Sequence, residues 1–497
     1  MGLTVDEIRD RAERFRATVV EELLEGRSGR KPWPELSSLY AGQRVLSWDA
    51  TAPAIERELA GASGERELRL RRLLGWAAEH QVRSDNAALD DEFSTWHATA
   101  SIELDGRHVP VRQLGALVET ATDRATRRRF ASLRSEAYEE IAPLQLDRLN
   151  LWRTSSEELG YGSYREAVQR LGGINLGALA REARRLLEET DAIYRAELER
   201  QLHRRIAIGV DDAEDHDVSW LGRMEWLDIP CEETGILDAT RADLAASGLE
   251  LEAGGRVDLV IEPFPGPGMR PCCAPIRVPD RVVLFVTPTS TPRACRRLLR
   301  ELGHAVHWSR TDASLPFEYR TIGDGSVAEA HGLLFSGLAL APAWVETSRG
   351  LSGESLEEYL RLASLLDLLE IRRVAGRLLF DLEVCESPRP GSLGPRWAEL
   401  MSEATGFRHD PRRYLERLGQ RFGAARELRG RMLAALLETE VRARFGDAWF
   451  REPDAGAFLR QWLSGGLSRD ATELAELLGA PGLGAEPIVR AARERLG

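Results

Sequence analysis

Apolar residues that recur every three or four positions are the feature that most limits the fold of this chain. The spacing occurs around residues 178–206 and again at 355–385 and 424–445, with Arg and Glu between the apolar positions. A period close to 3.6 residues places such side chains along one stripe of an α-helix, where they pack against a core. The sequence therefore predicts a mainly α-helical protein. Its 497 residues could form one large domain or roughly two to four smaller ones.

The middle of the chain departs from this helical pattern. Two runs rich in β-branched residues, at 276–279 and 281–286, predict short strands. Thr291 and Pro292 then supply an N-cap and a proline at the first helical position. We therefore expect a small β element at about 256–290, followed directly by a helix.

Composition restricts the partners and the location of the chain. The 80 acidic residues outnumber the 67 basic ones, for a formal charge of −13. Nucleic acid is not expected as a partner, because phosphate binding needs an excess of Lys and Arg. The arginines at 296–297 lie in a helical pattern and are interpreted as part of a solvated face. No apolar run approaches the about 20 residues that span a bilayer, and the N-terminus lacks the apolar core of a secretory signal. The five cysteines lack C-x-x-C spacing, so we expect reduced thiols, no membrane partner and a cytoplasmic location.

The helix that follows the β element carries the side chains of greatest chemical interest. Arg300, His304 and His307 lie at i, i+4 and i+7 and share one face, with Glu301 beside them. In a zinc helix, two histidines one turn apart bind the metal, and the glutamate after the first one activates a bound water. Here an arginine stands in the first histidine's place. A further predicted helix carries Glu329, a candidate third ligand, 25 residues beyond His304. The apolar stripe of the first helix consists of Leu298, Leu299, Leu302, Ala305 and Val306.

Three runs in this region, at 270–286, 298–307 and 315–330, resemble the catalytic segment of the oligoendopeptidase F and thimet oligopeptidase family. Shorter likenesses elsewhere extend the resemblance over about residues 100–480; they lie at 103–106, 159–164, 444–450 and 456–460. The family's fold is mostly helical, with two lobes around a deep cleft in which short peptides are cut with one zinc ion.

The resemblance implies a single peptidase-like domain over residues 1–497. Its N-terminal helical lobe would span about 1–255, and its C-terminal lobe would contain the zinc-type helix and span about 291–497. The small β element would join the two.

By position, the resemblance implies that Glu301 is the general base and that His304 and Glu329 are two zinc ligands, with the first ligand lost. The family also has two tyrosines, in a Phe-Tyr-x-x-x-Tyr-Leu-Arg pattern, that donate hydrogen bonds to the tetrahedral intermediate. This chain has Gly423 and Glu427 at those places. Two parts of the catalytic machinery are therefore missing.

Arg300 should exclude zinc from the old site. A catalytic zinc takes three protein ligands and a water, whereas a guanidinium stays protonated and adds positive charge where the metal would sit. Two unit charges about 4 Å apart repel by roughly 4 kcal/mol at an effective dielectric of about 20. We therefore expect no cofactor, and we predict that Arg300 replaces the metal as the local cation and pairs with Glu329. The alternative is a shifted zinc site built from His304, His307, Glu329 and His331.

Three functions remain open at this stage. The first is a degenerate peptidase homologue that binds a peptide, an amino-acid-derived ligand or a protein partner in the old cleft without zinc-dependent hydrolysis. The second is a metal-independent enzyme that acts on a small substrate through an acid, a base and an anion clamp. The third is an active zinc oligopeptidase with an atypical ligand set. The candidate catalytic residues are Glu301, His304 and Arg300. The candidate ligand-binding residues are His307, Glu329, His331 and Tyr319.

Overall fold

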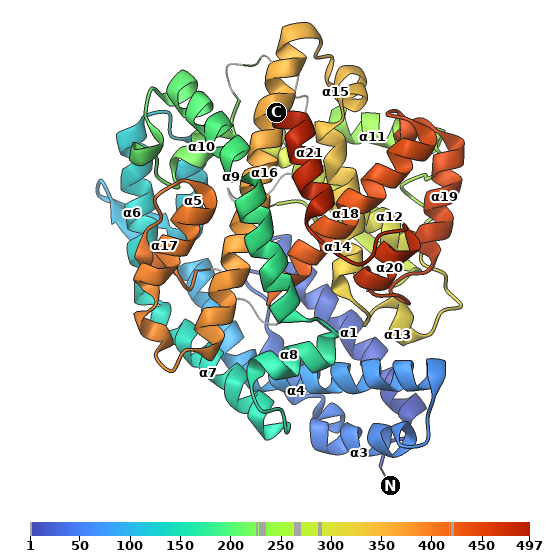
Figure 1. Ribbon diagram of the computed structural model, residues 1–497. Helices are drawn as coiled ribbons and strands as arrows, with labels where there is room; N and C mark the ends of the chain where they lie inside the picture. Colours follow the sequence, from blue (N-terminus) through green and yellow to red (C-terminus); the bar gives the residue numbers. More distant parts are fainter. Residues whose placement is uncertain are drawn as a thin grey trace.

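The computed structural model describes residues 2–497 except for 225–226, 228–234, 263–269, 287–290, 417 and 419–421. The protein is mainly α-helical, as the sequence predicts (Figure 1). The helices before the main sheet are α1 Val5–Arg27, α2 Leu36–Ala41, α3 Trp48–Leu59, α4 Gly64–Thr99, α5 Val111–Thr120, α6 Arg124–Glu140, α7 Ala142–Glu158, α8 Tyr164–Gly172, α9 Leu176–Ile206, α10 Asp217–Leu221 and α11 Gly235–Ala246. Those after it are α12 Pro292–Arg310, α13 Phe317–Arg320, α14 Gly325–Ser336, α15 Pro342–Arg349, α16 Gly353–Glu386, α17 Gly394–Thr405, α18 Gly423–Phe445, α19 Pro453–Ser464, α20 Ala471–Leu477 and α21 Glu486–Leu496.

The three segments with helical periodicity form the long helices α9, α16 and α18, so these predictions are confirmed. The zinc-type helix α12 begins at Pro292, and the Thr291 side chain caps it by accepting a hydrogen bond from the Ala294 N–H. None of the described helices has an apolar stretch long enough to cross a bilayer. The described cysteines are free thiols, with Cys272 and Cys295 buried and the other two partly buried; Cys231 lies outside the described residues.

The predicted β element is a three-stranded sheet with strand order β3-β5-β4. Strand β5, Arg281–Val286, matches the prediction, and β4, Cys272–Arg277, begins four residues earlier than predicted. Strand β3, Val257–Ile261, lies inside the predicted β element but was not predicted as a strand. It pairs in parallel with β5, and no local pattern in the sequence signals this pairing. The hairpin of β1, Ser101–Leu104, and β2, Arg107–Pro110, was also missed, although its Asp-Gly turn is a recognised hairpin signal.

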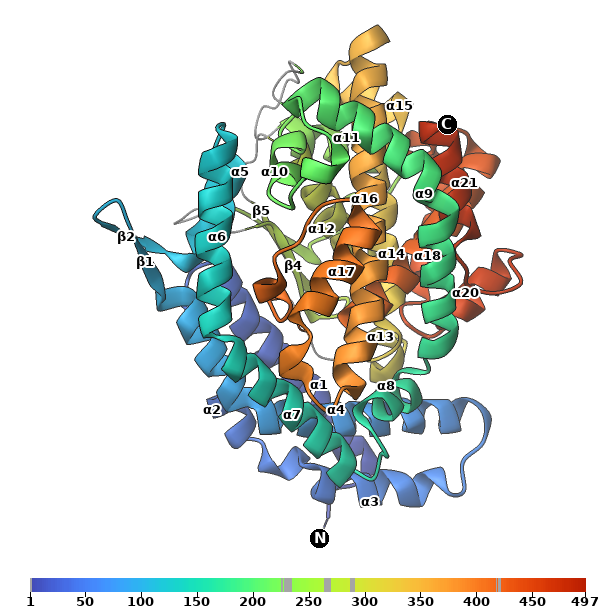
Figure 2. The ribbon, with the colours of Figure 1, turned by 60° about the vertical axis from the view of Figure 1, so that its left-hand side comes forward.

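The sheet lies between α1 and α12, which explains the continuous apolar run of β5. Val283 and Phe285 pack on the side of α1 with Leu24, while Val282 and Leu284 pack on the side of α12. A strand covered on both faces needs apolar residues at every position rather than at alternate ones. In Figure 2, β4 and β5 lie between α5 and α6 on one side and α12, α14 and α16 on the other.

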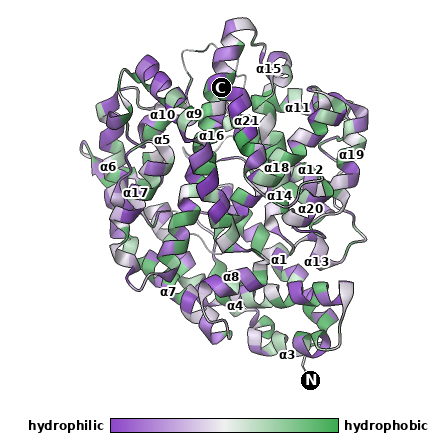
Figure 3. Ribbon diagram, in the orientation of Figure 1, coloured by the Kyte–Doolittle hydropathy of each residue, from purple (hydrophilic) through white to green (hydrophobic). Residues whose placement is uncertain are grey.

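Close contacts between α12, α14 and α18 form the centre of the C-terminal part. The predicted apolar stripe of α12 is completely buried, and Figure 3 shows hydrophobic residues along α12 and α14 and hydrophilic ones along the outer helices α6 and α9. Glycines allow the close approach: a Cβ at Gly303 would lie 2.8 Å from the His331 carbonyl oxygen, and one at Gly430 would lie 2.7 Å from the Glu329 Cβ. The three helices are therefore near enough for their polar side chains to meet.

Candidate functional site

Arg300 lies between two carboxylates at this three-helix contact. It donates a hydrogen bond from Nη2 to the Glu329 carboxylate on α14, so the ion pair expected from the sequence is present. Its Nη1 lies 3.9 Å from Oε1 of Glu427 on α18, which in turn accepts a hydrogen bond of 3.0 Å from Arg431. Nε of Arg426 lies 3.7 Å from the other Glu329 oxygen. The charges alternate, so each carboxylate has at least one guanidinium beside it.

This arrangement fixes the ionisation of the pair. Burial alone would raise the pKa of Glu329, but Arg300, followed by His304 and Arg426, holds that pKa at about 2. Burial alone would likewise lower the pKa of Arg300, but Glu329, followed by Glu427, holds it above its ordinary value. Both groups are therefore charged near neutral pH.

Glu301 and His304 take different directions from the same helix. His304 turns toward α14, with Nε2 3.9 Å from Oε2 of Glu329. Gly332 makes room for it, because a Cβ there would lie 2.7 Å from the His304 Nε2. Glu301 turns toward the sheet, where Oε2 accepts a 2.7 Å hydrogen bond from the Cys273 backbone N–H on β4. The predicted base is thus anchored to the edge of the sheet.

His307 and His331 are core residues. Their rings lie 4.4 Å apart, with exposed fractions of 0% and 1%. Trp462 donates a 3.1 Å hydrogen bond to Nε2 of His331, so that nitrogen's lone pair is already engaged. Burial, followed by the neighbouring histidines, holds the pKa of His307 well below its ordinary value and that of His331 at about 3. Both rings are therefore neutral near pH 7.

The structure does not assemble the shifted metal site. Among the described residues, no group of three or more His, Cys, Asp or Glu side chains is placed to hold a metal ion.

Tyr319, a candidate ligand-binding residue, is 7% exposed and packs beneath the guanidinium of Arg72.

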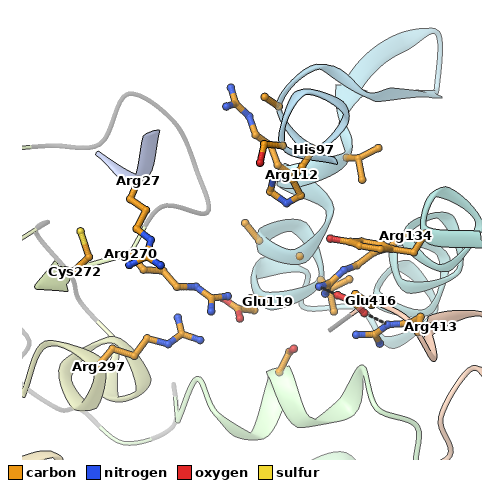
Figure 4. Close-up of a pocket in the computed structure, with 18 of the residues that line it drawn as sticks. Arg27, His97, Arg112, Glu119, Arg134, Arg270, Cys272, Arg297, Arg413 and Glu416 are labelled. Atoms are coloured by element: carbon orange, nitrogen blue, oxygen red, sulfur yellow. Dashed lines mark hydrogen bonds and ion pairs between the residues drawn. The ribbon is translucent and has the colours of Figure 1, made fainter. Parts of the chain in front are cut away.

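A cavity of about 1230 Å³ lies beside these positions. In Figure 4, residues of α1, α12 and the β4 edge of the sheet line one side of it (Arg27, Arg297 and Cys272), and residues of α4, α5 and α6 line the other (His97, Arg112 and Arg134). Of the candidate site residues, Glu301 is the one that lines this cavity within the described part of the chain. Contacts of His307, Glu329, His331 or Tyr319 with a ligand thus stay predictions, since none of these four residues is on the cavity wall.

Comparison with known proteins shows which solved structures share this architecture. The chain superposes on the solved structure of PZ peptidase A with an inhibitor at a TM-score of 0.66 and 16% identity, over 98% of this chain and 86% of the other. It matches an X-ray structure assigned as an oligoendopeptidase F equally well, at a TM-score of 0.66 and 16% identity, over 100% and 96% of the two chains. The chain has the fold of these peptidases. No protein-family model matches the sequence, and no curated protein does. At 16% identity the likeness extends to the fold, so the chemistry has to be argued from the residues of this chain.

Sequence reasoning missed several residues around the site. Glu427 stands at one of the two tyrosine places, and no signal in the sequence indicated that its carboxylate also faces Arg300. The arginines at 296–297 were interpreted as a solvated face; Arg296 instead pairs with the partly buried Asp367, and Arg297 lies on the cavity wall. The spacing of Arg293, Arg297 and Arg300 along one helix was the signal that could have predicted a basic face.

The ion pair gives a pH-dependent test of its contribution to stability. Glu329→Gln is expected to lower the free energy of unfolding by about 2 kcal/mol at neutral pH, because it removes a largely buried charge partner of Arg300. The folded-state pKa of about 2 lies below the ordinary 4.5, so the contribution is complete above pH 4.5 and is lost as the pH falls through about 2. Urea unfolding over this range should show the natural chain and the variant converging. The control is Glu67→Gln, in an exposed i,i+4 pair with Arg71, which should cost under about 0.5 kcal/mol. A gap that stays constant down to pH 2 would contradict the assignment.

Proposed function

We propose that this protein keeps the peptidase fold but binds a peptide or amino-acid-derived ligand without zinc-dependent hydrolysis. The observation that carries the proposal is the ion pair of Arg300 with Glu329. Two of the three ligand places that the family resemblance implies are occupied by partners of one salt bridge. The remaining donor, His304, cannot hold a catalytic zinc alone, so the residues present do not fit the metal.

The tyrosine places support the same proposal. Hydrolysis of a peptide bond passes through an oxyanion that needs hydrogen-bond donors. Gly423 has no side chain to donate, and Glu427 is a carboxylate that already accepts from Arg431. An acidic group at this place would repel the oxyanion rather than stabilise it. Restoring a metal would therefore not be enough to restore hydrolysis.

The cavity supports ligand binding as the retained activity. Its volume of about 1230 Å³ exceeds that of typical small-molecule pockets, about 300–1,000 Å³, and suits a short peptide.

Metal content is the direct test. Protein purified without chelator and without an affinity metal should contain far less than one zinc per chain by elemental analysis. Fluorogenic peptides should stay uncleaved with and without added zinc, while a zinc peptidase taken through the same purification serves as the positive control. About one zinc per chain, or zinc-dependent cleavage, would instead support an active oligopeptidase with an atypical ligand set.

A second candidate is a metal-independent enzyme that uses Glu301, His304 and Arg300. One observation favours it: the Glu301 carboxylate reaches the cavity wall while the Cys273 N–H fixes one of its oxygens. A positioned carboxylate can transfer protons to or from a bound substrate. This candidate requires turnover of a small substrate that Glu301→Gln abolishes and that chelators leave unchanged.

A further inference from the structure

The cavity beside Glu301 is strongly basic, although the protein as a whole is acidic. Eleven Lys or Arg side chains and four Asp or Glu side chains are among the described residues that line it. The 497 residues together carry a formal charge of −13. Positive charge is thus concentrated at one concave site, where low-dielectric walls strengthen its field.

Some of these basic side chains have acidic partners within the cavity wall. Arg413 donates to Glu416 at 2.6 Å and to Asp215 at 2.8 Å, and Arg134 pairs with Glu416 as well. Arg293 donates to Glu119 at 3.0 Å. These pairs make up a structural framework that joins the two sides of the cavity.

Other arginines have no such partner. Within the described part of the chain, Arg27, Arg112, Arg270 and Arg297 form no ion pair with a carboxylate. Figure 4 shows Arg27, Arg270 and Arg297 extending toward one region of the cavity, from the end of α1, the residues just before β4 and the middle of α12. Arg112 reaches the same cavity from α5.

Electrostatic repulsion makes the proximity of these arginines unfavourable. Burial, followed by the charges of Arg293 and Arg270, lowers the pKa of Arg297 to about 9. Arg297 still carries its charge near neutral pH, so like charges are held together. Glu119, the acid that offsets the charge of Arg297 most, is already paired with Arg293. A bound oxyanion would relieve this repulsion, and a guanidinium can hold a carboxylate through two parallel hydrogen bonds.

We infer that Arg27, Arg270 and Arg297, with Arg112 across the cavity, bind the carboxylates of an acidic peptide. This inference rests on the proposed function and specifies the class of its ligand. The placement of the arginines supports a peptide: Arg27, Arg270 and Arg297 extend toward one region, and Arg112 lies on the opposite side of the cavity. A chain with several acidic groups can reach both places, whereas one compact anion can reach only one of them.

Calorimetric titration of the full-length protein with three end-blocked octapeptides, rich in Glu, Gln or Lys, tests the inference. The Glu-rich peptide should bind at least about tenfold more tightly than the Gln-rich one, and added salt should reduce the difference. The double variant Arg270→Gln/Arg297→Gln should remove most of the preference. Arg469→Gln, at an exposed position outside the cavity wall, should leave it unchanged. The comparison of peptides on the natural chain requires no variant, so it holds even if the double variant fails to fold.

The outcomes distinguish a failure of this inference from a failure of the proposed function on which it rests. Equal binding of the Glu-rich and Gln-rich peptides, or an unchanged preference in a folded double variant, would overturn the acidic class and leave peptide binding intact. Binding of tripolyphosphate with no binding of any peptide would overturn both this inference and peptide binding as the proposed function, and would indicate a site for free phosphates. Binding of no peptide and no phosphate would overturn both as well.

Discussion

Arg300→His is expected to bind zinc at least about a hundredfold more tightly than the natural chain and yet to cleave peptides poorly. The change supplies a third donor beside His304 and Glu329 and removes a fixed positive charge from the same place. Loss of an outer-shell partner alone costs about 10–100-fold in metal affinity, so gain of a direct ligand should exceed that range.

The geometry favours the restored metal site. The two remaining donors, Nε2 of His304 and Oε2 of Glu329, are 3.9 Å apart. Zinc bonds to such atoms are about 2.0–2.2 Å long and tetrahedral, which places two donors about 3.4 Å apart, so the pair has to close by only about 0.5 Å to share one ion. Without Arg300, the Glu329 carboxylate loses the guanidinium that now occupies it. Zinc titration against a competing chelator measures the change directly.

Turnover should remain low because, under the proposed function, neither tyrosine place supplies an oxyanion donor. Loss of one such donor costs about 10²–10³ in kcat, and neither Gly423 nor Glu427 supplies one. Arg300→Gln is the control: it removes the charge without adding a ligand and should gain little zinc affinity. Turnover by Arg300→His close to that of an active oligopeptidase would contradict the importance of the tyrosine places. Equal zinc affinity in the two variants would contradict the role of a third ligand.

Helices with a strong local period could be predicted from the sequence, and so could the environment of α12. Its stripe of leucines at three- and four-residue steps specifies a buried face whatever packs on it, and the structure buries that face completely. Strand β3 could not be predicted in this way. Its partner is β5, about 25 residues further on, and a parallel pairing depends on how the connection folds back.

The candidate site likewise contains residues that could be grouped from the sequence and residues that could not. Arg300 and Glu329 could be paired from the sequence because the resemblance places both at one metal. Arg27, Arg112, Arg270 and Arg297 could not be grouped, since they come from four separate parts of the chain and only the packing of α1, α5 and α12 around the sheet brings them to one cavity. Charge clusters within one helix are visible in a sequence; those built from several elements are not.

Glycines at the contacts between helices set the geometry of the site. Replacing one of them with a larger residue should therefore have the second large effect, a loss of stability. In Gly303→Val, the Cβ would lie 2.8 Å from the His331 carbonyl oxygen, 2.9 Å from Phe335 and 3.0 Å from the Gly332 Cα. Two of these three neighbours are backbone atoms and cannot rotate away. The two methyl groups of valine extend beyond a Cβ that is already too close.

Gly303→Val is therefore expected to lower the free energy of unfolding by about 3 kcal/mol or more. Valine is a slightly better helix former than glycine, but that gain is under about 0.5 kcal/mol and does not change the sign. Gly423→Val is the matched control, because a Cβ at this first residue of α18 meets nothing within 4 Å and should change stability by less than about 0.5 kcal/mol. Urea unfolding of the two variants measures the contrast. A Gly303→Val protein as stable as the control would mean that α12 and α14 can separate freely, and the ion pair of Arg300 with Glu329 would then not depend on their close packing.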